Sequence, residues 1–136
     1  MPIPAFLSSL RVLLAVDAAT CAAMGVALVL GSPIVAGLTA LPAPLLFYAG
    51  LLLLPIAAFM AIVAMQNPVS NAAAWLVVGG NVLWVAASML LLVGGWVAPN
   101  AFGWAFVIVQ AVAVAVLAKL EHAALARSPL ASFGTN

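Results

Sequence analysis

The residues with the greatest chemical potential in this sequence are its few charged side chains. Among 136 residues there are two acidic and three basic side chains. One acid, Asp17, lies inside the apolar stretch "LLAVDAATCAAMG" (13–25). An ionised carboxylate in hydrocarbon costs about 2.5–3.5 kcal/mol on insertion scales, so Asp17 is expected to face other helices and to pair with a cation or hold a proton. It is either a static interhelical lock or a proton- or cation-binding group in a transport path.

Two basic residues are candidate partners for the acids. Lys119 would reach Asp17 if the first and last apolar segments are neighbours, because its long stem is flexible; otherwise it extends to lipid headgroups. Arg11 is better placed to pair with Glu121 at the cytoplasmic edge of the membrane. The sequence therefore predicts an Arg11–Glu121 pair and leaves two alternatives for Lys119, a contact with Asp17 or an extended side chain at the headgroups.

Two amide side chains extend this intramembrane polar set. Asn81 and Gln110 both fall near the middle of apolar segments that are antiparallel neighbours in the chain. We expect them to hydrogen-bond to each other, and such contacts contribute about 0.6 kcal/mol. Asn81 also shares a helical face with Trp84 and Ser88. Together with Tyr48, Trp84 and Ser88 are candidate lining residues for a lipid-like ligand.

Signals for enzymatic chemistry are weak. The single histidine, His122, is predicted at a membrane boundary, and Cys21 is the only cysteine. No cluster with metal-ligand spacing and no nucleophile or phosphate-binding motif is present, so we expect no enzyme activity, metal or cofactor. A net charge of +1 also provides no electrostatic footprint for nucleic acid.

The elements that carry these residues are predicted to be membrane-spanning helices. The chain is 69% hydrophobic and 4% charged, and its apolar runs are too long for a soluble core. Clusters of proline, glycine and amide residues at 31–44, 66–71 and 94–100 separate four runs. We expect one domain, 1–136, forming an all-α bundle of four transmembrane helices with short loops. The predicted spans are about 8–30, 43–65, 72–94 and 99–124, and the first is expected to be retained rather than cleaved as a signal peptide.

The basic residues predict the orientation. Arg11, Lys119 and Arg127 all lie near the two ends of the chain, and the three connecting segments contain none. Because cytoplasmic flanks carry the excess of lysine and arginine, both termini are expected to face the cytoplasm.

Small residues predict close helix packing and association. The first and last spans contain many alanines, which let helices approach each other closely. The lipid bilayer is one expected partner, and a second copy of the chain or a larger membrane complex is another.

Two resemblances bear on function. The stretches "NVLWVAASMLLLVGGWVAPNAFGWAFVIVQA" and "LAKLEHAALARS" resemble the small, mostly uncharacterised four-helix proteins of bacterial inner membranes, which implies the same multi-pass location. The length, four spans and acid in the first span resemble the small multidrug resistance transporters, whose first-helix glutamate binds protons and cationic substrates. Here the acid is an aspartate, the family's aromatic spacing is absent, and only Asp17 corresponds.

Two functions therefore remain open. The first is a non-enzymatic packing or accessory module of a membrane assembly, or a binder of a lipid-like ligand. The alternative is a dimeric proton-coupled transporter of small solutes in which Asp17 is the proton or cation site.

Overall fold

The computed structural model describes residues 9–126 and shows four helices in that part of the chain. They are α2 (Leu10–Thr39), α3 (Ala43–Met65), α4 (Asn71–Val93) and α5 (Ala101–Ala126). Each is long enough and apolar enough to cross a membrane. The predicted all-helical architecture with four potential spans is confirmed. Arg127 lies outside the described residues.

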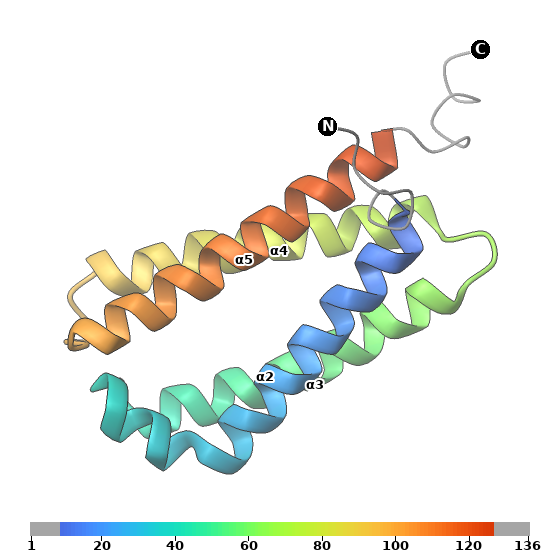
Figure 1. Cartoon of the computed structure of the whole chain (residues 1–136). Coiled ribbons are helices and arrows are strands. Elements are labelled where there is room, and N and C mark those ends of the chain that lie inside the picture. The colour runs from blue at the N-terminus through green and yellow to red at the C-terminus, as the bar shows by residue number, and fades with distance from the viewer. Residues whose placement is uncertain (1–8, 127–136) are drawn as a thin grey trace.

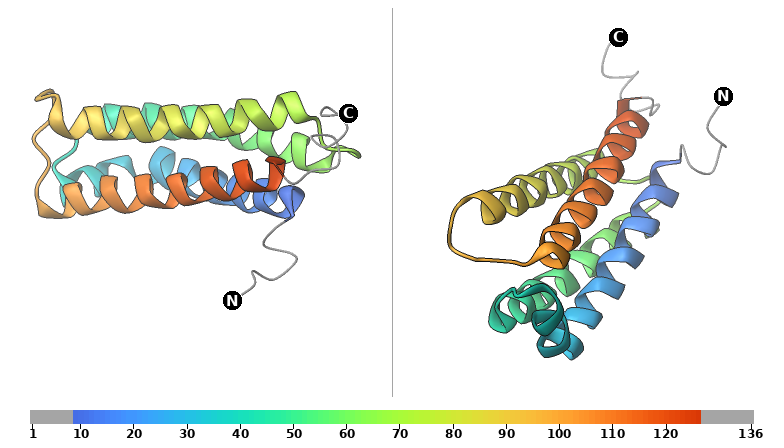
Figure 2. Two further views of the ribbon diagram at one scale, coloured as in Figure 1. Left: turned by 90° about the horizontal axis from the view of Figure 1, so that it is seen from above. Right: turned by 60° about the vertical axis from the view of Figure 1, so that its left-hand side comes forward.

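The helices form two antiparallel hairpins, α2–α3 and α4–α5, which lie across each other (Figure 1). α2 packs extensively on α3 and α4 on α5; the hairpins meet mainly through α2 and α5, and α3 touches α4 little. Residues 40–42 and 94–100 connect the helices at one end, called here the loop end. The start of α2, the turn 66–70 and the end of α5 lie at the opposite, terminal end (Figure 2).

The boundaries of the last three helices agree with the predicted spans to within two residues, but the first helix does not. The predicted break at 31–44 is wrong for most of its length, because α2 continues to Thr39. The backbone kinks at Gly31 (φ −117°, ψ 16°), and Pro33 lies just beyond the kink. A proline is tolerated there because the first turn of a helical segment needs no hydrogen bond from its backbone nitrogen.

α2 and α3 approach each other most closely where two glycines meet. A Cβ atom at Gly50 would lie 2.8 Å from the Gly25 carbonyl oxygen and 2.8 Å from the Leu28 Cβ. The missing side chains thus allow backbone-to-backbone contact, and such contact increases dispersion attraction between helices.

The buried apolar side chains form two main clusters along the bundle. One, nearer the terminal end, includes Leu14, Met60 and Val77. The other, nearer the loop end, includes Leu28 and Val107. Cys21 of α2 packs against both clusters, so the polar residues one turn from it lie between two apolar layers.

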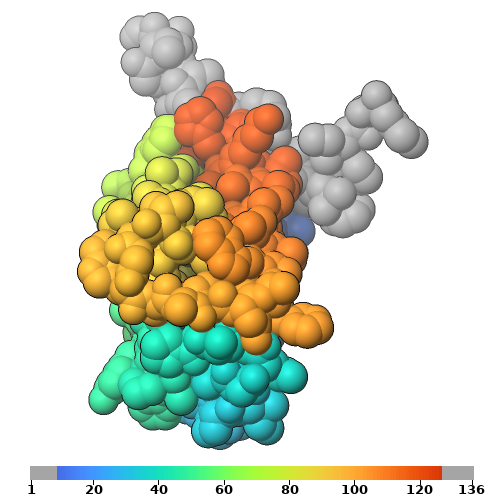
Figure 3. Space-filling view, turned by 90° about the vertical axis from the view of Figure 1, so that its left-hand side faces the viewer, coloured from blue at the N-terminus to red at the C-terminus, as the bar shows by residue number. Residues whose placement is uncertain are grey.

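Asn100 closes the loop end of the bundle. Its backbone N–H donates to the Thr39 carbonyl (3.0 Å) and its side-chain amide donates to the Leu38 carbonyl (3.0 Å). Its Oδ1 accepts from the Gly103 N–H (2.9 Å), which caps the start of α5. The space-filling view from this end shows the α4–α5 connection lying against the α2–α3 turn (Figure 3).

Candidate functional site

Three helices contribute one buried polar cluster. The Nδ2 atom of Asn81 in α4 donates to Asp17 Oδ2 of α2 at 2.7 Å and to Glu121 Oε1 of α5 at 2.9 Å. The exposed fractions of these side chains are 5% for Asn81, 1% for Asp17 and 0% for Glu121. We call these three residues the carboxyl cluster; a single amide nitrogen in it serves two carboxyl groups.

The remaining carboxyl oxygens have different surroundings. Asp17 Oδ1 accepts from the thiol of Cys21, one helical turn later, at 3.7 Å. Thr20 does not join the cluster, because its hydroxyl donates to backbone carbonyls of its own helix. Glu121 Oε2 is buried and has no hydrogen-bond partner among residues 9–126. The cluster therefore has more acceptor oxygens than its neighbours supply with hydrogen-bond donors.

Small and apolar neighbours allow the three side chains to meet. Ala18 follows Asp17 on the buried face of α2, and Ala118 lies one turn before Glu121 on α5; both are buried. Val77 and Val78 precede Asn81 on the buried face of α4. Alanines at these positions leave room between the helices for the Asn81 side chain to reach both acids.

The predicted ion pairs are absent from this arrangement. Lys119 is exposed: it precedes Glu121 by two residues, about 200° around the helix, so burial of Glu121 turns Lys119 outward. Arg11 donates from Nη2 to the Gln66 carbonyl (2.7 Å) at the α3–α4 turn, not to Glu121. The Arg11–Glu121 prediction is therefore wrong. Of the two alternatives for Lys119, the contact with Asp17 is absent, and neither described cation contacts the two acids.

A second polar cluster is half-buried, electrically neutral and fully paired. Gln110 Oε1 accepts from Trp84 Nε1 (2.8 Å), and its Nε2 donates to Ser88 Oγ (3.0 Å) and the Val107 carbonyl (2.9 Å). Ser88 donates in turn to the Trp84 carbonyl at 2.8 Å. We call Trp84, Ser88 and Gln110 the amide cluster; it ties α4 to α5.

These partners replace the predicted Asn81–Gln110 hydrogen bond. The connection 94–100 sets the register of the α4–α5 hairpin so that Gln110 lies opposite Trp84 and Ser88. Asn81 lies about one turn nearer the terminal end. It meets Glu121 instead, whose side chain leans back toward the start of its own helix.

The three predicted ligand-lining residues do not come together. Trp84 and Ser88 belong to the amide cluster, whereas Tyr48 lies on α3 with 67% of its surface exposed. Its ring packs edge-on against Phe47, with centroids 5.5 Å apart.

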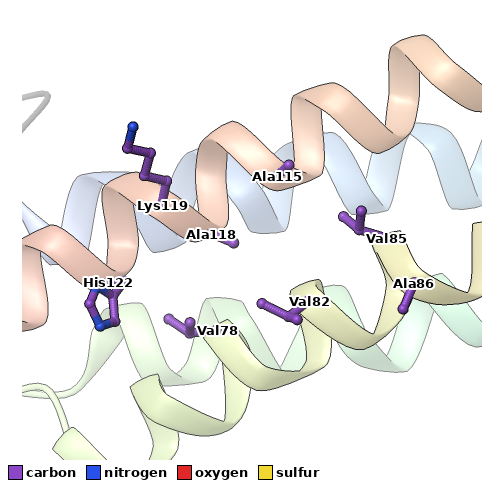
Figure 4. Close-up of a pocket in the computed structure, with 8 residues that line it drawn as sticks. All are labelled: Val78, Val82, Val85, Ala86, Ala115, Ala118, Lys119 and His122. Carbon is purple, nitrogen blue, oxygen red and sulfur yellow. The ribbon is translucent and has the colours of Figure 1, made fainter. Parts of the chain in front are cut away.

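Two grooves open on the outer surface of the bundle. A groove of about 630 Å³ between α2 and α3 is lined largely by alanines, including Ala15, Ala19, Ala22 and Ala61. A groove of about 480 Å³ lies between α4 and α5 (Figure 4). The carboxyl cluster lines neither groove. Within residues 9–126, no group of three or more histidine, cysteine or acidic side chains is arranged to hold a metal ion.

Sequence reasoning placed Asp17 and Asn81 on inward faces and Glu121 at the cytoplasmic edge, and it did not assign the three residues to one another. The available signal was the predicted adjacency of the first and last spans, which brings Glu121 as well as Lys119 within reach of Asp17. Comparison with known proteins adds no assignment. No family model, curated protein or solved structure matches this chain.

Proposed function

We propose that this chain is a non-enzymatic protein of the bacterial inner membrane that binds and releases a proton at the carboxyl cluster as part of solute transport. Four apolar helices support insertion as a multi-pass protein. Arg11 lies at the terminal end and Lys119 in the half of α5 nearest that end, which supports cytoplasmic termini. An acid in the first span is also the feature shared with the small multidrug resistance transporters.

One observation carries this proposal: Asn81 bridges two buried carboxyl groups that no described cation contacts. If both groups were ionised, two negative charges would surround one nitrogen in a medium of low dielectric constant. Repulsion and desolvation both disfavour that state. A proton on one carboxyl group removes a charge and provides a hydrogen-bond donor at the site, where Glu121 Oε2 is otherwise unpaired.

The amide cluster supports a role for the acids beyond helix packing. Gln110, Trp84 and Ser88 already tie α4 to α5 with every described hydrogen bond between neutral groups. Neutral amides could join α2 to these helices at a lower desolvation cost than carboxyl groups. Intramembrane acids that are not needed for packing are typical of proton pathways.

The fold also offers a way to couple proton binding to movement. The carboxyl cluster joins α2 of one hairpin to α4 and α5 of the other, while α3 and α4 make few contacts. Loss of the proton would place charge between the hairpins and weaken their contact. A rocking motion of one hairpin against the other would then give the cluster alternate access to the two sides.

The proposal is tested by proton flux into vesicles that contain the purified protein and a pH-sensitive dye. Under an imposed pH gradient we expect faster flux in wild-type vesicles than in protein-free vesicles. Asp17→Asn and Glu121→Gln should reduce the flux to the protein-free rate, because neither amide can carry the proton. Gln110→Met is the matched control: it removes a half-buried hydrogen-bonding group but no acid, so flux should persist. Wild-type flux equal to that of empty vesicles would contradict the proposal.

A second candidate function, a packing module of a membrane assembly, is favoured by the groove between α2 and α3. Its alanine lining would let a helix from a second copy or another subunit approach closely. Ala19→Leu and Ala61→Leu should then abolish co-isolation of the partner from native membranes in mild detergent. Proton flux by the same variants should be unchanged, because the groove does not include the carboxyl cluster.

A further inference from the structure

The groove between α4 and α5 combines apolar walls with positively charged and polar groups at one end. Its walls come from four residues of α4, namely Val78, Val82, Val85 and Ala86, and from Ala115 and Ala118 of α5. Lys119 and His122 complete it at the end nearer the chain terminus (Figure 4). The walls offer side-chain methyl groups only, and the valines are held in few rotamers, so the groove is largely preformed.

In the described part of the chain, the charged side chains on the outer surface have one sign. Both acids of the chain are buried in the carboxyl cluster, so the exposed ionic side chains of residues 9–126 are Arg11 and Lys119. An anionic group near the groove therefore meets Lys119 without opposition from a surface carboxylate. A second copy of this chain would instead bring the same positive charges toward the same face.

The chemistry of His122 and Trp75 suits the level of a lipid headgroup. Their rings pack edge to face with centroids 5.2 Å apart. Tryptophan prefers the interface between headgroups and hydrocarbon, where its ring is apolar on one side and can donate a hydrogen bond on the other. In Figure 4 the His122 ring turns toward α4, while the Lys119 ammonium points out of the groove.

We propose that this groove binds one acyl chain of an anionic phospholipid, whose phosphate lies against Lys119 and His122 at the cytoplasmic side. The hydrocarbon chain follows the valine and alanine walls toward the loop end. The Lys119 ammonium lies outside the groove and so meets the headgroup rather than the chain, which its flexible stem allows. This inference depends on the proposed insertion and orientation of the bundle but not on proton transport.

The experiment is native mass spectrometry of the detergent-purified protein titrated with phosphatidylglycerol or with phosphatidylcholine of the same acyl chains. We expect tighter retention of phosphatidylglycerol. Lys119→Gln should lower that affinity about fivefold, the effect of one lysine near an anionic surface, and should leave phosphatidylcholine retention unchanged. Ala115→Leu, which fills the groove, should lower retention of both lipids.

Arg11→Gln is the matched control, because Arg11 is an exposed cation that does not line this groove. Its phosphatidylglycerol retention should equal that of the wild type. The proposal is overturned if the wild type retains both lipids equally, or if Arg11→Gln and Lys119→Gln lose the anionic lipid to the same extent. Because lipid retention is measured apart from proton flux, a failure here does not depend on the outcome of the transport experiment.

Discussion

At the scale of single residues, Asn81 holds the central position because one nitrogen donates to carboxyl groups from two other helices. It neutralises no charge, so it stabilises the acids through hydrogen bonds alone. The strength of these bonds depends on the acids themselves, since hydrogen bonds to ionised groups are stronger than those between neutral groups.

Replacement of Asn81 by leucine should therefore destabilise the bundle, because both acids lose the hydrogen bond from the Asn81 amide inside an apolar core. A buried polar group left unpaired costs about 1–3 kcal/mol, and the loss is measured from unfolding in detergent followed by circular dichroism. In the Asp17→Asn, Glu121→Gln background the same substitution should cost less, since no carboxyl group remains to be stranded. Equal losses in the two backgrounds would show that Asn81 acts only by filling space.

The sequence predicted that Asp17 and Asn81 face inward, but it did not predict the partners that the structure shows. Burial of Asp17 follows from the desolvation of a carboxylate and needs no knowledge of neighbouring helices. The hydrogen-bond partner of a buried side chain depends on how deep its helix lies and how the helix is rotated, and both must be known to within one helical turn. The Asn81–Gln110 prediction failed at that scale, because Asn81 lies about one turn away from the position opposite Gln110.

At the scale of helices, two local contacts hold the bundle together and can be tested separately, one within the α2–α3 hairpin and one between the hairpins. α2 and α3 meet at Gly25 and Gly50, where their backbones are in contact. The end of α2 is tied to the start of α5 through Asn100.

Gly50→Ala should destabilise the α2–α3 hairpin, because the added methyl group would meet backbone and a neighbouring Cβ that cannot move alone. Overpacking of this kind costs about 1–3 kcal/mol. Gly79→Ala on α4 is the control, since nothing lies within 4 Å of the position a Cβ would take there. It should be neutral or slightly stabilising, and thermal unfolding in detergent measures both. A larger loss for Gly79→Ala than for Gly50→Ala would contradict the observed crossing.

Asn100→Ala should cost more than Ser70→Ala, although both remove a helix N-cap. Ser70 accepts from the Ala73 N–H and caps α4 alone, whereas the Asn100 side chain caps α5 and also donates to the Leu38 carbonyl. Loss of a cap costs about 0.5–2 kcal/mol. The free energies of unfolding of the two variants provide the comparison, and equal values would mean that the contact with α2 contributes nothing.

Helix boundaries were predictable where apolar runs meet turn residues at both ends. Pro42 precedes α3, and the turn 66–70 separates α3 from α4. The segment after Gly31 was misread because glycine, serine and proline in sequence resemble a loop. That segment resumes as a helix because Pro33 lies in its first turn, where a missing N–H costs nothing.

At the scale of the whole molecule, two hairpins enclose a carboxyl cluster between two apolar layers. The apolar runs and the breaks between them predicted four helices, because the length and hydropathy of each run are properties of the run itself. How the hairpins lie across each other was not predictable, since it depends on which small residues meet in space.

The proposed orientation predicts which loops can be labelled from outside the cell. In a Cys21→Ala background, a cysteine replacing Ala98 at the loop end should react with a membrane-impermeant maleimide in intact cells. A cysteine replacing Asn67 at the terminal end should react only after permeabilisation. Both residues are exposed, so accessibility reports the side of the membrane. The reverse pattern would place the termini outside the cytoplasm.

Infrared spectroscopy of the carboxyl groups tests the central claim most directly, because Asp17 and Glu121 are the only acidic side chains in the chain. At neutral pH we expect the carbonyl band of a protonated carboxylic acid, which shifts on exchange into heavy water and is missing from the Asp17→Asn, Glu121→Gln variant. If the wild-type spectrum at neutral pH shows carboxylate bands but, like the double variant, lacks the carbonyl band of a protonated acid, the two groups do not hold a proton. That result would contradict the account.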